Sequence, residues 1–181
     1  EISSRGEKLP HYTEVGVGFS KMCLTPMLEY GRQALEDNKK GVATEALEQV
    51  ALAIVVTTAI VSIFLTRDFT PDYNSGLAHA CFYALTAYPV IEKEHLHGEV
   101  VGFGVLYALL VDGQQEEFEK IYALNKELGL PVRIADIGIT EEQFFETMDR
   151  IPQMSDIRHY PYAVTKEMLM QAYETIEQLP V

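Results

Sequence analysis

Two histidines are the side chains whose type and spacing best suit metal chemistry. His79 lies in the segment GLAHA (76–80) and His97 lies in the segment HLHGE (95–99). Imidazole is the commonest metal ligand among protein side chains, and the small residues around His79 leave room for another group to approach. Because the two histidines are 18 positions apart (79 to 97), one unbroken helix would separate them by about 27 Å. They can share a metal only if the chain reverses between them.

The residues between the two histidines contain a candidate point of reversal. Pro89 stops a helix, and the charged stretch Glu92-Lys93-Glu94 suits a return loop. A second helix starting at Gly98 would then bring both histidines to one end of a helical hairpin. A catalytic zinc usually takes three protein ligands. The pattern by itself therefore leaves two interpretations open, a metal pair or histidines that are hydrogen-bonded in the core.

The other polar candidates are interpreted as structural. We expect His11 and His159 to be hydrogen-bonded in the core, and His95 to be exposed to solvent beside the acidic loop. Asp72 and Glu99 lie near the histidines in the sequence, but carboxylates next to loops are usually solvated.

Two further patterns indicate packing rather than chemistry. The residues expected in the core are Cys81, Phe82, Phe103 and Tyr107. The segment GVGFSK (16–21) looks like the start of a phosphate-binding loop, but it lacks the third glycine and a preceding strand. It is predicted to be an ordinary helical segment.

Helical periodicity covers most of the chain. It predicts about seven helices, which cover residues 12 to the 30s, 44–65, 75–88, 98–111, 114–128, a segment opened by the capping box at 140–143, and 165–179. Gly129-Leu130-Pro131 is a helix stop, and Pro26 is expected to kink or split the first helix. The strand signals at 100–101 and 132–134 are too short to form a sheet. The predicted fold class is therefore all-α, a multi-helix bundle.

The most apolar segment is the run Val50 to Leu65. As a helix its 16 residues would extend about 24 Å, less than the roughly 30 Å of a bilayer core. Thr57, Thr58 and Ser62 also dilute it. A helix that is apolar on all sides is typical of a protein interior, so we expect this run to be the central core helix and expect no membrane partner.

Composition and charge restrict the possible partners. The chain has 181 residues, 14 Lys+Arg against 27 Asp+Glu, and a formal net charge of −13. This charge argues against nucleic acid and against anionic membrane surfaces. Residues 1–5 contain no apolar signal-peptide core, and two cysteines without metal-type spacing favour a reducing, cytoplasmic location. The length fits one domain or a very compact pair, and residues 1–181 are predicted to form one helical domain.

The histidine segments also resemble those of a known family. The segment GLAHA (76–80) followed by HGEVVGFG (97–104) is similar to the "AHA" helix and the downstream "HGEKVAFG" of the glycerol dehydrogenase branch of the iron-containing alcohol dehydrogenase family. Three further landmarks agree, LTAYP (85–89), GLP (129–131) and IRHYP (157–161). The resemblance covers essentially the whole chain, as the helical C-terminal domain of that family.

The resemblance implies a two-domain oxidoreductase. An N-terminal α/β domain, absent from this chain, would bind NAD(P), and this helical domain would hold a divalent metal, zinc or iron, through His79 and His97. The metal would act as a Lewis acid on the substrate hydroxyl during hydride transfer. Small polyols, hydroxy acids and ketones are the implied substrates, and self-association as a homo-oligomer is compatible with the family. The resemblance places no cofactor-binding residue in this chain.

This sequence departs from the family pattern at two ligand-side positions. The family's third ligand is an aspartate in a "GD" motif, a few residues before a stretch that Glu1-Ile2-Ser3 resembles. In addition, Phe82 stands where the family has a second histidine. The chain alone is expected to be inactive because it has no cofactor site, and to bind a metal only weakly because the aspartate is missing. A non-catalytic helical interaction or oligomerisation domain derived from the same family is the alternative, and the upstream reading frame would discriminate between the two.

Overall fold

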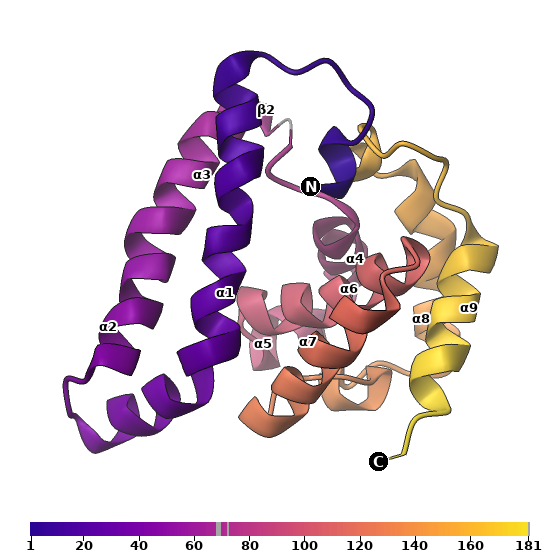
Figure 1. The fold of residues 1–181 in the computed structure, drawn as a ribbon. Helices are drawn as coiled ribbons and strands as arrows, with labels where there is room; N and C mark the ends of the chain where they lie inside the picture. Colours follow the sequence, from indigo (N-terminus) through magenta and orange to yellow (C-terminus); the bar gives the residue numbers. More distant parts are fainter. Residues whose placement is uncertain (68–69, 72, 181) are drawn as a thin grey trace. The chain divides into compact units, whose positions relative to one another are not determined.

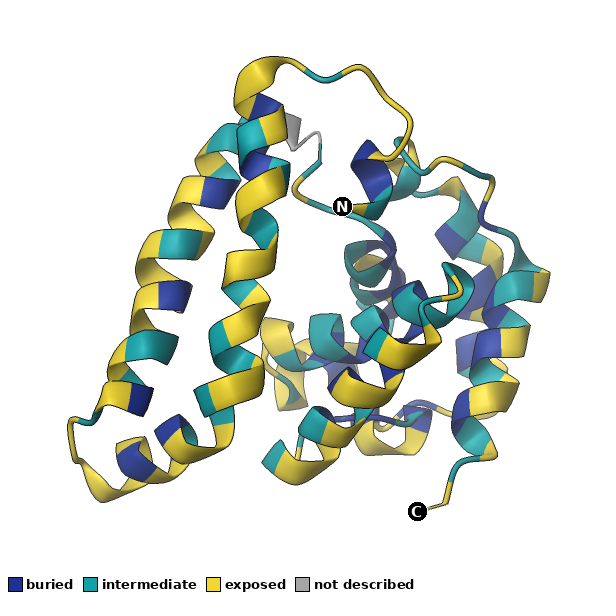
Figure 2. Cartoon of the chain, viewed as in Figure 1, coloured by how far each residue is buried: buried dark blue, intermediate teal, exposed yellow. Residues whose placement is uncertain are grey.

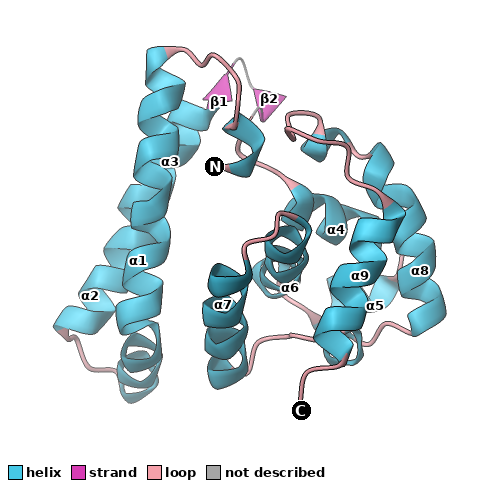
Figure 3. Cartoon of the chain, turned by 45° about the vertical axis from the view of Figure 1, so that its right-hand side comes forward, coloured by secondary structure: helices cyan, strands magenta, loops and turns pink. Residues whose placement is uncertain are grey.

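The computed structural model of the protein describes residues 1–67, 70–71 and 73–180 (Figure 1). Contacts group most of residues 1–74 into one unit and the residues from Ser75 onward into a second unit. The predicted all-α class is confirmed, because helices make up nearly all of the regular structure in the described residues. The exceptions are the two-residue strands β1 (Thr66–Arg67) and β2 (Thr70–Pro71), which pair antiparallel between the predicted helices 44–65 and 75–88 (Figure 3).

The first unit is built on a helical hairpin. A short 3-10 helix, Ile2–Ser4, precedes the chain's longest helix, α1 (His11–Lys40), which is followed by α2 (Glu45–Leu52), a π-helical turn (Ala53–Thr57) and α3 (Thr58–Leu65). Pro26 lies inside α1 and does not split it. The hairpin turn is held by the buried carboxylate of Asp37, which accepts hydrogen bonds from the Gln33 amide and the Thr44 hydroxyl. Thr44 also caps α2 by accepting the Leu47 N–H.

The run from α2 to α3 is not the central core helix that its composition predicts. Figure 2 shows most of the run exposed, and the residues Val55 and Ile63 are 69% and 73% exposed to solvent. The residues buried along the run are Ala46, Ala53, Val61 and Leu65. The expectation was wrong because a helix that is apolar on all sides can be buried on every side only if other elements cover it. The composition of the helix does not show whether they do. Within its own unit the run packs mainly on α1.

The residues from Glu45 to Leu65 form one continuous helical run, the only described segment long and apolar enough to cross a membrane. Its length is 21 residues. A helix that packs against protein passes the same test of length and composition. The GVGFSK segment, as predicted, lies within α1, where Gly16 is close-packed against α3 rather than open for a phosphate.

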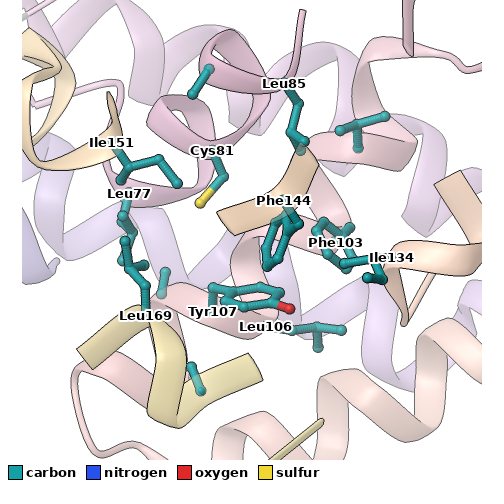
Figure 4. Packing of buried hydrophobic residues seen from close by; sticks show 14 of the residues in the cluster. Leu77, Cys81, Leu85, Phe103, Leu106, Tyr107, Ile134, Phe144, Ile151 and Leu169 are labelled. Atoms are coloured by element: carbon teal, nitrogen blue, oxygen red, sulfur yellow. The ribbon is translucent and has the colours of Figure 1, made fainter. Parts of the chain in front are cut away.

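The second unit contains the main hydrophobic core (Figure 4). Its α-helices are α4 (Leu77–Leu85), α5 (Pro89–Glu94), α6 (His97–Val111), α7 (Gln115–Leu128), α8 (Glu141–Arg150) and α9 (Lys166–Glu177). Its 3-10 turns are Ile134–Ile137, Ile151–Gln153 and Ser155–Ile157. The central helix is α6, which packs on α4, α7 and α9. Phe103 and Tyr107 of α6 are fully buried and contact Phe144 of α8 edge to face.

The helix signals at Gly129, Thr140 and Thr165 in this unit are confirmed. Gly129 ends α7 in the left-handed conformation (φ 72°), where glycine is favoured. Thr140 and Gln143 form the predicted capping box of α8, and Thr165 caps α9 by accepting the Met168 N–H. The strand signals at 100–101 and 132–134 were weak, and residues 100–101 lie inside α6.

The start and end of α4 differ from the prediction. The residue preceding it is Gly76, and the first N–H, that of Leu77, donates to the hydroxyl of Tyr160, 83 positions further along the chain. The helix ends at Leu85, and Pro89 opens the short helix α5 instead of only closing α4. Proline suits the first turn of a helix because its missing N–H has no helical partner there.

Candidate metal centre

The turn between α4 and α6 brings the two candidate histidines together. The chain leaves α4 at Leu85, passes through α5 and enters α6 at His97. The stretch predicted as a return loop, Glu92-Lys93-Glu94, is the end of α5, so a short helix performs the reversal. The resulting pair α4–α6 has the most extensive contact of any two helices in the described structure.

The ring centroids of His79 and His97 are 5.7 Å apart, with an interplanar angle of 44°. Two imidazoles that bind one zinc at about 2.1 Å would have ring centres about 5 Å apart in tetrahedral geometry. The pair therefore fits a shared metal after a small side-chain adjustment. His79 is half-buried and His97 is exposed, so a ligand can reach the pair from solvent.

Burial lowers the pKa of His79 below its usual value, because the charged imidazolium loses hydration. The neighbouring His97 lowers it further by repulsion, and the carboxylate of Asp156 acts in the opposite direction. A lowered pKa keeps the imidazole neutral, which is the form that binds a metal. The electrostatics of the pair thus agree with its geometry.

Aromatic rings surround the histidine pair on the α4 side. The ring of Phe82 lies 4.4 Å from that of His97, edge to face at 77°, and Tyr83 lies 5.3 Å from Phe82 and 6.3 Å from His79. Phe82 is only half-buried, so its expected place in the core is only partly correct. Cys81, on the opposite side of α4, is fully buried as predicted.

Two of the other histidines lie in surroundings unlike those expected. His11 opens α1 with 91% of its side chain exposed, 3.8 Å from Glu14, so it is not a core histidine. His95 keeps only 15% exposure and lies 3.6 Å from Glu99, so it is not a solvated side chain. His159 is half-buried.

Of the two carboxylates noted in the sequence, Glu99 has its contacts elsewhere. Glu99 accepts the N–H of Leu96 and serves as a cap of α6. Asp72 lies outside the described residues. Across the part of the chain that the structure describes, no group of three or more His, Cys, Asp or Glu side chains is placed to hold a metal ion.

Asp156 is the residue near this site that sequence reasoning missed. It lies in the 3-10 turn Ser155–Ile157, which packs on α4, and its charge acts on His79. No spacing rule connects the two residues, because the contact depends on how the C-terminal part of the second unit folds back. A carboxylate behind a ligating histidine commonly orients the imidazole.

The histidine pair lies outside the main cavity of the second unit. A cavity of about 540 Å³ in the second unit is lined instead by His95, Glu99, Tyr122 and residues 129–133, among others. Neither His79 nor His97 lines it.

Comparison with known proteins points to one family. The chain is 31% identical over 134 residues to a glycerol dehydrogenase of Escherichia coli O6:H1, covering 72% of this chain and 33% of that protein. It is 28% identical over 169 residues to a glycerol dehydrogenase of Thermotoga maritima, covering 88% of this chain and 43% of that protein. No family model matches the chain. The chain thus spans less than half the length of these relatives.

The fold points in the same direction. The crystal structure of a probable glycerol dehydrogenase from Sinorhizobium meliloti superposes with a TM-score of 0.76 at 23% identity, covering 97% of this chain and 49% of that one. Sequence similarity along most of the chain and a shared helical fold agree with the motifs around His79 and His97. The chain belongs to the glycerol dehydrogenase-like branch of the iron-containing alcohol dehydrogenase family and corresponds to the helical C-terminal domain of its members.

Proposed function

We propose that this chain is the metal-binding, substrate-side domain of a metal-dependent, NAD(P)-linked alcohol or polyol dehydrogenase. The observation that carries the proposal is the approach of the His79 and His97 rings to 5.7 Å. Glycerol dehydrogenase is the name of the relatives, and small polyols, hydroxy acids or ketones are the proposed substrates. A cytoplasmic location and assembly as a homo-oligomer are part of the same proposal.

His79 and His97 are the two protein ligands that this chain would contribute to Zn²⁺ or Fe²⁺. A divalent metal held by these two imidazoles would supply a Lewis acid for the substrate hydroxyl. The donor set fits, since both zinc and iron accept imidazole nitrogen and a carboxylate completes such sites in metalloenzymes. The described residues supply no third ligand around the pair, so we propose that a carboxylate outside them completes the site.

The chain's own residues bind and orient rather than transfer hydride. The helices α4 and α6 hold the two imidazoles, and burial keeps His79 neutral and ready to bind. We propose that the nicotinamide cofactor is bound mainly by an N-terminal α/β domain outside this chain. The chain by itself should therefore bind a metal weakly and should not catalyse hydride transfer.

Isothermal titration with Zn²⁺ tests the metal site on this chain. We expect measurable binding by the wild type and a loss of at least about tenfold in affinity for His79→Ala and for His97→Ala. His11→Ala is the matched control, because His11 is exposed at the start of α1 and should leave the affinity unchanged. Zn²⁺ binding that survives both His79→Ala and His97→Ala would rule out the proposed site.

The exposed run Glu45–Leu65 favours a second candidate function, a non-catalytic helical domain that serves association. An apolar surface of this kind often marks an interaction site. Light scattering of the purified chain separates the candidates, because association without any Zn²⁺ binding by His79 and His97 would support this second function alone.

A further inference from the structure

We propose that Phe82 makes the substrate side of the histidine pair apolar and thereby selects against substrates with a second hydroxyl next to the reacting carbon. This inference rests on the proposed function, because it concerns the site formed by His79 and His97. The favoured substrates carry hydrogen or an alkyl group at the carbon beside the alcohol or carbonyl carbon.

The position of Phe82 is the first support. Phe82 follows His79 by three residues on α4, so the two side chains lie on one face of the helix, one turn apart. The Phe82 ring contacts the His97 ring at a centroid distance of 4.4 Å, closer than the two histidine rings are to each other. A group bound between the two histidines therefore has Phe82 as an immediate neighbour.

The exposure of the aromatic rings is the second support. The core-facing side of α4 carries Cys81, Ala84 and Leu85, which are buried. Phe82 is only half-buried, and Tyr83, which contacts its ring at 5.3 Å, is 47% exposed. Part of the Phe82 ring therefore packs against the core, and the rest of it lies beside the histidines.

The chemistry of the phenyl ring then decides which substrate atoms are tolerated. A phenyl ring neither donates nor accepts a conventional hydrogen bond, so a hydroxyl placed against Phe82 loses water without gaining a partner. An alkyl group in the same place gains apolar contact. An apolar site discriminates against one added hydroxyl by about 100-fold at most. We therefore expect an effect of about 10- to 100-fold in the ratio of kcat/KM values.

The test compares two alcohols that differ by one hydroxyl, propan-2-ol and propane-1,2-diol, with the gene product that contains this chain. The kcat/KM ratio of diol to propan-2-ol should rise by at least about tenfold in Phe82→Asn, because the amide can hydrogen-bond the second hydroxyl. Phe82→Leu, which stays apolar, should keep the ratio within about threefold. Phe145→Asn is the matched control, a half-buried phenylalanine on α8 that contacts Tyr173, and it should not change the ratio.

A second measurement does not depend on turnover. Replacement of the bound metal by Co²⁺ gives a visible spectrum, and the shift of that spectrum on adding each alcohol gives its dissociation constant. The preference for propan-2-ol over the diol should appear in the wild type and weaken by at least about tenfold in Phe82→Asn. An unchanged preference in both measurements overturns the inference. So does loss of metal binding in both Phe82→Asn and Phe82→Ser with retention in Phe82→Leu, since Phe82 would then only support the fold.

Failure of this inference is distinguishable from failure of the proposed function. If His79→Ala and His97→Ala leave metal affinity unchanged, the metal site itself is wrong and the role of Phe82 falls with it. If both variants lose the metal while Phe82→Asn leaves the alcohol preference intact, the site stands and only the assignment of Phe82 is overturned.

Discussion

A Cβ atom at Gly104 would lie 2.6 Å from the carbonyl oxygen of Ala78, the residue directly before His79. The backbones of α4 and α6 therefore approach so closely that any side chain at position 104 would force them apart. Because His79 is on α4 and His97 opens α6, this contact sets the distance between the two imidazoles.

Gly104→Ala should weaken the proposed metal site without touching either histidine. The added methyl group meets backbone atoms of Ala78, which cannot move aside as a side chain can. We expect a loss of about 1–3 kcal/mol in unfolding free energy and a loss of at least about tenfold in Zn²⁺ affinity. Gly102→Ala is the control on the same helix, because a Cβ at Gly102 meets no atom within 4 Å. Equal Zn²⁺ affinity in the two variants would contradict this account.

The titration of His79 should respond to its two charged neighbours. We expect NMR to place its pKa below the usual 6.5, because burial penalises the imidazolium. His97→Ala should raise that pKa by removing repulsion, though not to 6.5, since burial remains. Asp156→Asn should lower it by removing attraction. If neither substitution changes the pKa of His79, then His97 and Asp156 do not act on its charge.

The same shift has a consequence for stability against pH. Between the lowered pKa of folded His79 and its ordinary unfolded value of 6.5, the unfolded chain binds more protons than the folded chain. Unfolding free energy should therefore fall as the pH drops through this window and recover above it. In His79→Gln this part of the pH dependence should vanish, and chemical denaturation at a series of pH values would detect it.

Cys81 should be chemically inert in the folded protein. It is fully buried, and burial raises the pKa of its thiol to about 12. The thiolate is the reactive form, so a thiol reagent at pH 8 should modify the half-buried Cys23 first and Cys81 only on unfolding. Fast modification of both cysteines in the absence of denaturant would show that α4 is not packed as described.

Opposite residues on α3 should differ in their tolerance of charge. Val61→Asp places a carboxylate at a buried position and should cost several kcal/mol, on the order of 3 or more. Ile63→Asp introduces the same group at an exposed position and should change the unfolding free energy by less than about 0.5 kcal/mol. Thermal unfolding of the two variants measures the difference. Equal destabilisation would indicate that Ile63 is covered in the native protein.

Local signals were the most predictable part of this fold. Gly129 ends α7 and Thr140 caps α8 through contacts with residues no more than about one helical turn away. The sequence around each of them is therefore sufficient to place the helix end. The meeting of His79 and His97 was also accessible, because it needs only one reversal between two helices.

Features that depend on distant neighbours were not accessible. The burial of His95, the cap that Tyr160 provides for α4 and the position of Asp156 all rely on contacts between segments far apart in the chain. The exposure of the run Glu45–Leu65 also depends on distant segments, because it results from the contacts that they do not make with the run. Its residues are apolar enough for a core, and nothing in its own pattern indicates that within its unit it packs mainly on α1.

The π-helical turn Ala53–Thr57 lets the helical run Glu45–Leu65 accommodate one additional residue. Ala53 and Val61 are buried on the same stripe although they are eight positions apart, which in a regular α-helix would turn them about 80° away from each other. The wider turn absorbs one residue, so that the effective spacing is seven and the stripe runs straight. A relative with one residue fewer here can present the same stripe with an ordinary α-helix. An insertion or deletion in this segment is thus absorbed locally, without shifting the residues that follow it.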